Sequence, residues 1–223
     1  MRSGGHQVSA PSVVLETSRL VLRKLEADDL DALARIYADP EVRRFFPEGT
    51  LDREETREEL EWIVDVYYRR YGYGLWATVL KETGQVIGRC GLLPWAVVPA
   101  MSAPLGLDNA PEDPSEAASI EVELAYMFAR EHWGRGLATE AARAIVAFGF
   151  DRLGLDRIIC LIDPENVASL KVASNVGMVA DGDVEIEGDV FPLFAITSAS
   201  ARLPTMQGHD EAFNRGADGS AHR

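Results

Sequence analysis

The sequence predicts an α/β (α+β) fold built around one mixed sheet, and three observations support this prediction. Apolar, β-branched runs alternate along the chain with segments in which apolar residues recur every three or four positions. Two pairs of apolar runs flank short glycine-containing turns, which is typical of antiparallel hairpins. A strand, a helix and another apolar strand follow one another over residues 120–162, which indicates a parallel pair joined by a right-handed crossover. Together these patterns predict a central sheet of about seven strands flanked by about four helices.

The N-terminal part of the domain is expected to supply one strand and two helices. Arg19–Leu25 alternates apolar and polar residues and predicts the first strand. A helix with one apolar face follows and ends at Asp39-Pro40, because the residue before a proline is disfavoured in a helix. A second helix is expected to begin at Asp52, where Glu55 stands three residues further on, as in a capping box.

The middle of the chain predicts a hairpin, a long loop and the central strand. Gly74–Leu80 and Val86–Leu93 are two strand-like runs on either side of Glu82-Thr83-Gly84. Residues 94–119 are rich in proline, alanine and acidic residues without periodicity, so we expect a loop insertion there, on the substrate side of the domain. Ile120–Phe128 then forms the central strand.

The remaining elements follow from periodicity and from glycine stop signals. They are a helix over residues 136–152, an apolar strand over 157–162, a short helix over 164–176, and a closing hairpin of residues 179–186 and 190–197. We expect a single domain over residues 13–198. Residues 1–12 predict a flexible N-terminal tail, and residues 199–223 have the small, polar composition of a disordered C-terminal tail.

Composition restricts the class of protein. The 223 residues are 47% hydrophobic and 26% charged, as in ordinary soluble domains. No apolar run approaches the roughly 20 residues of a membrane helix, and the N-terminus lacks the apolar core of a signal peptide, so we expect a cytoplasmic location without membrane partners. Cys90 and Cys160 lie in strand-like runs and are expected to be buried, reduced thiols. The four histidines are scattered, and we expect no metal.

The distribution of charge bears on partners. A formal charge of −14 argues against nucleic-acid binding and is compatible with a cationic amine substrate, although acidic surfaces often serve only solubility. Cationic side chains gather locally around one glycine turn: Arg130, His132, Arg135 and Arg143.

That turn lies between the central strand and the next helix. Gly134 and Gly136 remove Cβ atoms where the first amides of a helix lack intrahelical partners, which favours binding of a phosphate group. A Rossmann fingerprint would need a third glycine at Thr139, and no P-loop Gly-Lys-Ser/Thr occurs. The alternative is a glycine turn that only joins strand to helix.

Four stretches in this order resemble the GCN5-related N-acetyltransferase (GNAT) superfamily, in particular its ribosomal-protein-alanine acetyltransferase-like branch. They are LETSRLVLRKLEADDLDAL, QVIGRCGL, ELAYMFAREHWGRGLATEAARAIVAFGFDRLGLDRI and DPENVASLKVASNVGM. The resemblance implies an acetyl-CoA co-substrate and a GNAT fold whose sheet is splayed at the middle strands. The family's Gln/Arg-x-x-Gly-x-Gly/Ala motif falls on Trp133–Ala138, where Gly136 and Ala138 fit and Trp133 departs. The cofactor-binding residues implied are Tyr126, Met127, Phe128, Trp133, Gly134, Arg135, Gly136, Leu137, Ala138, Thr139, Asn166 and Ser169.

The resemblance also suggests catalytic roles. An amine must lose a proton before it attacks a thioester, and Glu123 is our choice of base, with Glu121 as the second choice; the alternative is that both are ordinary strand acids. The family uses a backbone amide of the central strand, here Phe128 or a neighbour, to polarise the thioester carbonyl. Many members place a tyrosine acid where this chain has Ala173, so Ser169 or Ser174 is considered instead. For Asn166, the alternative to cofactor contact is a helix cap.

Three functions remain open from the sequence. The first is transfer of an acetyl group to a primary amine, with a protein N-terminal α-amine as a candidate acceptor, by direct attack in a ternary complex. The second is acetylation of a small-molecule amine such as an aminoglycoside, polyamine or amino acid. The third is a CoA-binding regulatory domain without catalysis. A homodimer is possible, with contacts from Trp95 and the closing hairpin.

Overall fold

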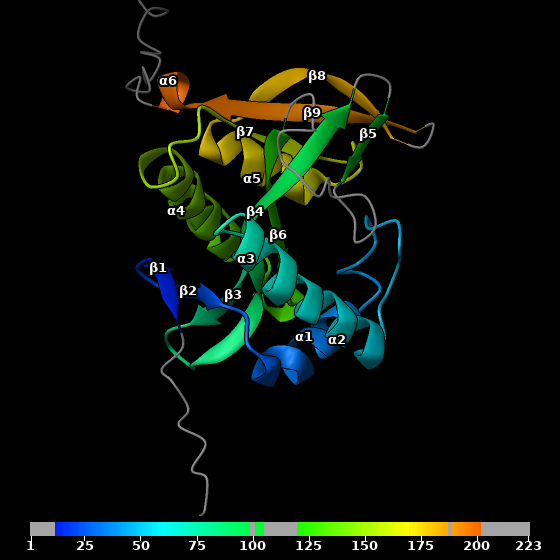
Figure 1. Ribbon diagram of the computed structural model, residues 1–223. Coiled ribbons are helices and arrows are strands. Elements are labelled where there is room, and N and C mark those ends of the chain that lie inside the picture. The colour runs from blue at the N-terminus through cyan, green and yellow to red at the C-terminus, as the bar shows by residue number, and fades with distance from the viewer. Residues whose placement is uncertain (1–11, 99–100, 105–119, 187–188, 202–223) are drawn as a thin grey trace, which may run out of the picture.

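The computed structural model describes residues 12–98, 101–104, 120–186 and 189–201. These residues form one mixed sheet in the order β1-β2-β3-β4-β6-β7-β9-β8, with β5 paired to β4 (Figure 1). All neighbouring strands are antiparallel except β6 and β7, which are parallel. The predicted α/β class and mixed sheet are therefore confirmed.

The N-terminal part contains β1 (Val13–Glu16), β2 (Leu20–Lys24), α1 (Leu30–Tyr37), α2 (Arg53–Trp62), a π-helical turn (Ile63–Tyr67) and α3 (Tyr68–Arg70). The predicted capping box is confirmed, because the Asp52 carboxylate accepts hydrogen bonds from the amides of Glu54 and Glu55 while Glu55 accepts from the amide of Asp52. The short edge strand β1 was not predicted, since four residues with little alternation carry no clear strand signal.

The hairpin of β3 (Leu75–Leu80) and β4 (Gln85–Val98) is longer than predicted. The expected loop from residue 94 was wrong over its first part, because β4 continues to Val98 and pairs with β5 (Met101–Pro104). Pro94 lies between two partners of β4 on one side, because the pairing with β3 ends at Gly91 and the described pairing with β5 begins at Trp95, so within the described residues no ladder hydrogen bond needs its missing N–H. Residues 105–119 of the expected loop lie outside the described residues.

The second half follows the predicted order. Its elements are β6 (Ile120–Phe128), α4 (Leu137–Asp151), β7 (Arg157–Leu161), α5 (Val167–Val176), β8 (Val179–Ile186), β9 (Asp189–Thr197) and α6 (Ser198–Ala201). Gly149 lets α4 lie close to the sheet, because a Cβ there would stand 2.8 Å from Cδ1 of Ile158. The predicted tails, residues 1–12 and 199–223, fall almost entirely outside the described residues.

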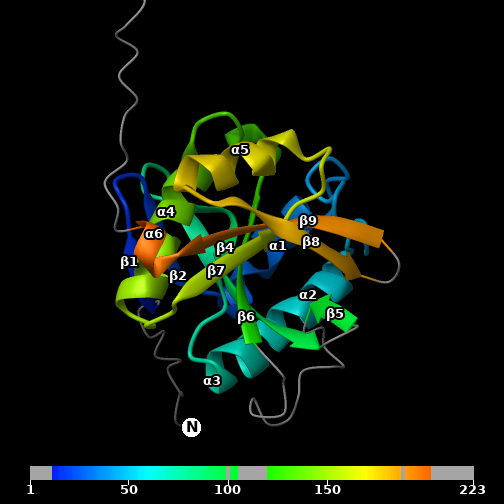
Figure 2. The ribbon, with the colours of Figure 1, turned by 90° about the horizontal axis from the view of Figure 1, so that it is seen from above.

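Two apolar clusters fill the layers on the two faces of the sheet. One packs α4 and α5 against residues such as Leu22, Leu124 and Ile158, and the other packs α1 and α2 against residues such as Leu75 and Met127. Figure 2 shows α5 and α2 on opposite sides of the strands. Within the described residues, no helix is both long and apolar enough to span a membrane.

Candidate active site

The candidate site is a cleft of about 1110 Å³. Its lining comes from the C-terminal half of β6, the glycine turn and first turn of α4, the start of α5, and the segment from residue 41 to α2. Most of the predicted site residues line it: Glu123, Tyr126, Met127, Phe128, Trp133, Gly134, Gly136, Leu137, Ala138, Thr139, Asn166 and Ser169. The fold thus brings together residues that lie more than forty positions apart in the sequence.

Strands β6 and β7 meet at one point and then separate. β6 is paired with β4 along its whole length. On its other side, the described residues show one pair with β7, Glu123↔Ile159. The two strands therefore form a fork whose C-terminal side opens into the cleft, and the splayed sheet implied by the resemblance is confirmed.

The backbone of β6 presents polar groups to this fork. The amide of Ala129 donates to the carbonyl of Ile87 at 2.8 Å, so this residue faces β4. Because antiparallel backbone groups alternate in direction, those of Tyr126 and Phe128 face the opposite side. One contact agrees, because the Phe128 carbonyl accepts a 2.8 Å hydrogen bond from Nε1 of Trp133. This geometry is compatible with a β6 amide acting on a carbonyl held in the fork.

The glycine turn has two glycines in the left-handed region. Gly134 has φ 71° and Gly136, the N-cap of α4, has φ 74°. A Cβ at Gly134 would meet no atom within 4 Å, so no side chain covers the loop there. The first amides of α4 have no intrahelical partner and belong to residues that line the cleft. An anion such as the pyrophosphate of CoA fits a helix end whose first amides lack intrahelical partners.

The cations around the turn have other partners. Arg135 places Nη1 3.1 Å from Nδ1 of His132 and Nη2 4.0 Å from Glu82, and it does not line the cleft. Arg130 pairs with Asp39 at 3.3 Å. Arg143 donates to the carbonyl of Asn175 at 2.8 Å. Because Arg135 does not line the cleft, a cofactor role for its side chain stays a prediction.

The two acids of β6 differ in surroundings. Glu123 lines the cleft at the base of the fork, where its Oε1 lies 3.4 Å from the amide of Leu161. Glu121 lies outside the cleft and pairs with Arg157, which also contacts Asp181. The geometry therefore favours Glu123 over Glu121 as a base, and its role stays a prediction.

The start of α5 closes one side of the cleft. Asn166 caps the helix through a 3.1 Å hydrogen bond from the amide of Ser169, so the capping alternative is confirmed without excluding a cofactor contact. The carbonyl of Ser169 accepts a hydrogen bond of 3.2 Å from the Tyr126 hydroxyl, and burial raises the pKa of that hydroxyl. Ala173 is buried, and Ser174 does not line the cleft, which leaves Ser169 as the better placed of the two serines.

A cluster of charged side chains that also lines the cleft was not predicted from the sequence. Arg89 of β4 places Nη2 3.0 Å from Oε1 of Glu59, and Nη1 of Arg43 lies 3.8 Å from Oε2. The Tyr37 hydroxyl also donates to Glu59, at 3.2 Å. Burial lowers the pKa of Arg43, although the Glu59 carboxylate opposes this effect. The signal in the sequence was an arginine inside the apolar run QVIGRCGL, because a buried charge requires a partner.

The chain belongs to the GNAT family of acetyltransferases, because the family model for the acetyltransferase (GNAT) domain matches residues 19–179. It is 35% identical to an uncharacterized protein of Bacillus subtilis, YkkB, over 74% of this chain and 84% of that protein. It is 30% identical to an uncharacterized N-acetyltransferase of Bacillus licheniformis, p20, over 75% of this chain and 83% of the relative.

Solved structures share the fold. A GNAT acetyltransferase from Bacillus anthracis superposes with a TM-score of 0.62 at 23% identity, covering 82% of this chain and 97% of that one. Two structures of CoA complexes are also similar. RimL, a ribosomal alpha-N-protein acetyltransferase, has a TM-score of 0.61 at 16% identity, covering 83% of this chain and 98% of that one. An aminoglycoside acetyltransferase, AAC(6')-Ib, has a TM-score of 0.60 at 15% identity, covering 81% of this chain and 96% of that one. At these identities the likeness establishes the fold alone.

Proposed function

We propose that the protein is an acetyl-CoA-dependent N-acetyltransferase that transfers the acetyl group to a primary amine by direct attack in a ternary complex. The observation that carries this proposal is that one cleft is lined both by the glycine turn with the first residues of α4 and by Glu123 at the base of the fork. Family membership supports the acetyltransferase activity, and the two similar structures that hold CoA support the co-substrate.

Different residues of the chain bind CoA and transfer protons in the reaction. The turn amides of Leu137–Thr139 would hold the pyrophosphate, and Trp133 and the β6 backbone would hold the rest of the molecule, whose thioester supplies an activated acetyl group. Glu123 takes a proton from the ammonium form of the acceptor, directly or through water. The amine nitrogen then bonds the acetyl carbon, the carbon–sulfur bond breaks, and the nitrogen releases its second proton to solvent. Solvent protonates the thiolate, either directly or through the Ser169 hydroxyl, which regains its proton from solvent. Alignment of the two substrates supplies much of the rate.

The acceptor is an amine that enters along the wall of α2. Phe45, Phe46 and Trp62 line the cleft together with Glu58 of α2, a combination that suits a cationic amine with an apolar neighbour. A peptide N-terminus fits this description. Because the pKa of its α-amine is near 8, this amine is more easily deprotonated by a base than a lysine side chain is. This favours the ribosomal-protein-acetyltransferase-like branch and a protein α-amine.

A small-molecule amine is the second candidate. The cleft carries several further carboxylates, those of Glu41, Glu55, Asp163 and Glu165, which would attract a polyamine or an aminoglycoside. The aminoglycoside acetyltransferase and the ribosomal enzyme have similar TM-scores, so fold similarity does not separate the two acceptors.

The deciding experiment measures thiol release from acetyl-CoA with peptides, polyamines, aminoglycosides and amino acids, and CoA affinity in parallel. Turnover with peptides in preference to polyamines would support the first acceptor, and the reverse preference would support the second. CoA binding without turnover of any amine would favour the regulatory alternative. Absence of CoA binding would refute the proposal.

A further inference from the structure

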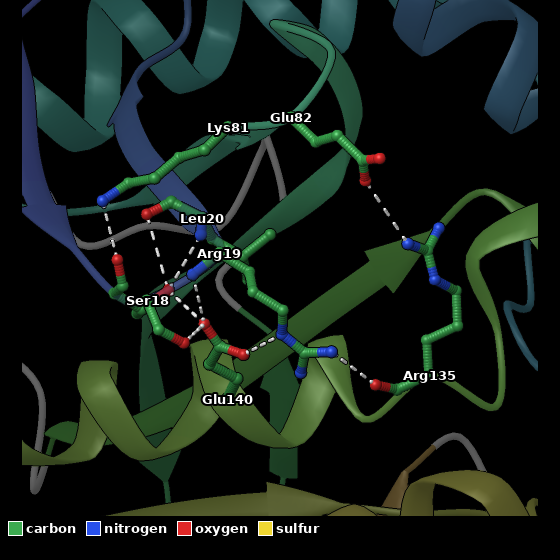
Figure 3. A network of polar contacts seen from close by, with 8 residues as sticks. Ser18, Arg19, Leu20, Lys81, Glu82, Arg135 and Glu140 are labelled. Atoms are coloured by element: carbon green, nitrogen blue, oxygen red, sulfur yellow. Dashed lines mark hydrogen bonds and ion pairs between the residues drawn. The ribbon is translucent and has the colours of Figure 1, made fainter.

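A dense group of polar contacts lies at the start of α4, around Glu140 (Figure 3). Its Oε1 accepts hydrogen bonds from the Thr17 hydroxyl at 2.5 Å, the Ser18 hydroxyl at 3.0 Å and the Arg19 amide at 2.9 Å. Its Oε2 accepts from Nε of Arg19 at 2.6 Å. One carboxylate in the first turn of α4 therefore fixes the whole turn between β1 and β2.

Arg19 carries this connection on to the glycine turn. Its Nη1 donates to the carbonyl of Arg135 at 2.9 Å, the residue between the two left-handed glycines. Its Nη2 lies 3.8 Å from the position that a Cβ on Gly136 would occupy. We call Thr17, Ser18, Arg19, Glu140 and the carbonyl of Arg135 the rear network.

The rear network touches the turn from the side away from the cleft. Gly134 and Gly136 line the cleft, as do the first three residues of α4, whereas Arg19, Arg135 and Glu140 do not. Because the guanidinium holds the Arg135 carbonyl on the rear side, the turn is fixed in the orientation that leaves its amides facing the cleft. The turn is thus shaped before any anion binds, which reduces the ordering cost of binding.

The charges of the rear network also balance. A carboxylate in the first turn of a helix is favourable for the helix dipole but repels an anion bound at the same end. Burial acts to raise the pKa of Glu140, yet the hydrogen bonds from Thr17, from the Arg19 amide and side chain and from Ser18 outweigh it and lower the pKa to about 2. The group therefore stays ionised, and Arg19 compensates its charge beside the glycine turn.

We propose that Arg19 and Glu140 are positioning residues for CoA: they hold the glycine turn from behind and so set the affinity of the cleft for the pyrophosphate. This inference rests on the proposed function, which assigns CoA to the cleft. It adds two residues from outside the family motif, one of them from the turn between β1 and β2.

The test compares CoA affinity, measured by calorimetry, with thermal stability in Glu140→Ala and Arg19→Ala. Each variant should bind CoA about tenfold more weakly than the unmodified protein, because charge-assisted bonds that fix the turn are lost. The double variant should lose no more than about as much as either single one, because the two residues act through one contact.

The matched control is Asp29→Asn, which disrupts a carboxylate–arginine pair between Asp29 and Arg23 of β2. Arg23 contacts Asp29 through two 2.7 Å hydrogen bonds, the pair is more buried than Arg19–Glu140, and neither residue lines the cleft. Asp29→Asn should lower the melting temperature at least as much as Glu140→Ala and leave the CoA dissociation constant unchanged. A folded Glu140→Ala that binds CoA like the unmodified protein would overturn the inference. The inference would also be overturned if Glu140→Ala and Asp29→Asn lost CoA affinity in the same proportion to their loss of melting temperature. If the unmodified protein bound no CoA, the proposed function itself would fail.

Discussion

Nε1 of Trp133 donates a 2.8 Å hydrogen bond to the carbonyl of Phe128, which joins the glycine turn to the last residue of β6. The indole stands where the GNAT motif carries a glutamine or arginine, and it remains 47% exposed on the cleft side. The departure from the motif therefore replaces a charged or amide side chain with an aromatic surface that is held in place by its own donor.

Trp133→Phe should weaken CoA binding by up to about fivefold, because it removes a hydrogen bond with a net contribution of about 1 kcal/mol but keeps an aromatic ring. Trp133→Ala should weaken it further. Calorimetric titration with CoA measures both. Equal affinities in all three proteins would mean that the indole has no part in the cofactor site.

Glu123→Gln should lower turnover by about a hundredfold or more, because the amide cannot accept the acceptor's proton. The apparent pH optimum should rise, since the reaction then depends on amine that is already deprotonated in solution, and CoA affinity should change little. Rate–pH profiles with a fixed acceptor provide the measurement. Glu121→Gln is the comparison, because Glu121 lies on the same strand outside the cleft; a larger loss there would transfer the role to Glu121.

Gly136→Ala should cost about 1–2 kcal/mol of stability, because the residue has φ 74° and a Cβ is disfavoured in the left-handed region. Gly136→Asp should in addition reduce CoA affinity sharply by placing a negative charge beside the phosphates. Gly84→Ala is a matched control, since Gly84 has φ 69° with no atom within 4 Å of a Cβ and lies in the β3–β4 turn. A Gly136→Asp variant that is folded and binds CoA normally would refute phosphate binding at the glycine turn.

Glu140 should contribute to acid sensitivity. Its pKa is about 2 in the folded protein and about 4.3 in an unfolded chain, so its stabilisation is present above pH 4.3 and is lost as the pH falls towards 2. Glu140→Gln should therefore be much less stable than the unmodified protein at about pH 6, and the difference should shrink by about pH 3. Urea unfolding at both values tests this, and a difference independent of pH would contradict it.

Local signals predicted most elements of this fold. The capping box at Asp52 and Glu55 spans only four residues, and the end of α5 is signalled by a single residue, Gly177, which has φ 90°. The contacts that shape the site are not local. Arg19 and Glu140 are separated by 121 positions, and no spacing rule links them. The pairing of Arg43 and Arg89 with Glu59 likewise depends on how α2 is placed over β4.

The fork between β6 and β7 has a consequence for hydrogen exchange. The amides of Met127 and Ala129 point towards β4 within a continuous ladder. The amides of Tyr126 and Phe128 point into the fork, where β6 and β7 have diverged. The second pair should exchange with solvent faster than the first. A bound extended amide chain, such as a pantetheine arm, would act as the missing strand and close the ladder, so protection at these two positions would report occupancy of the fork directly.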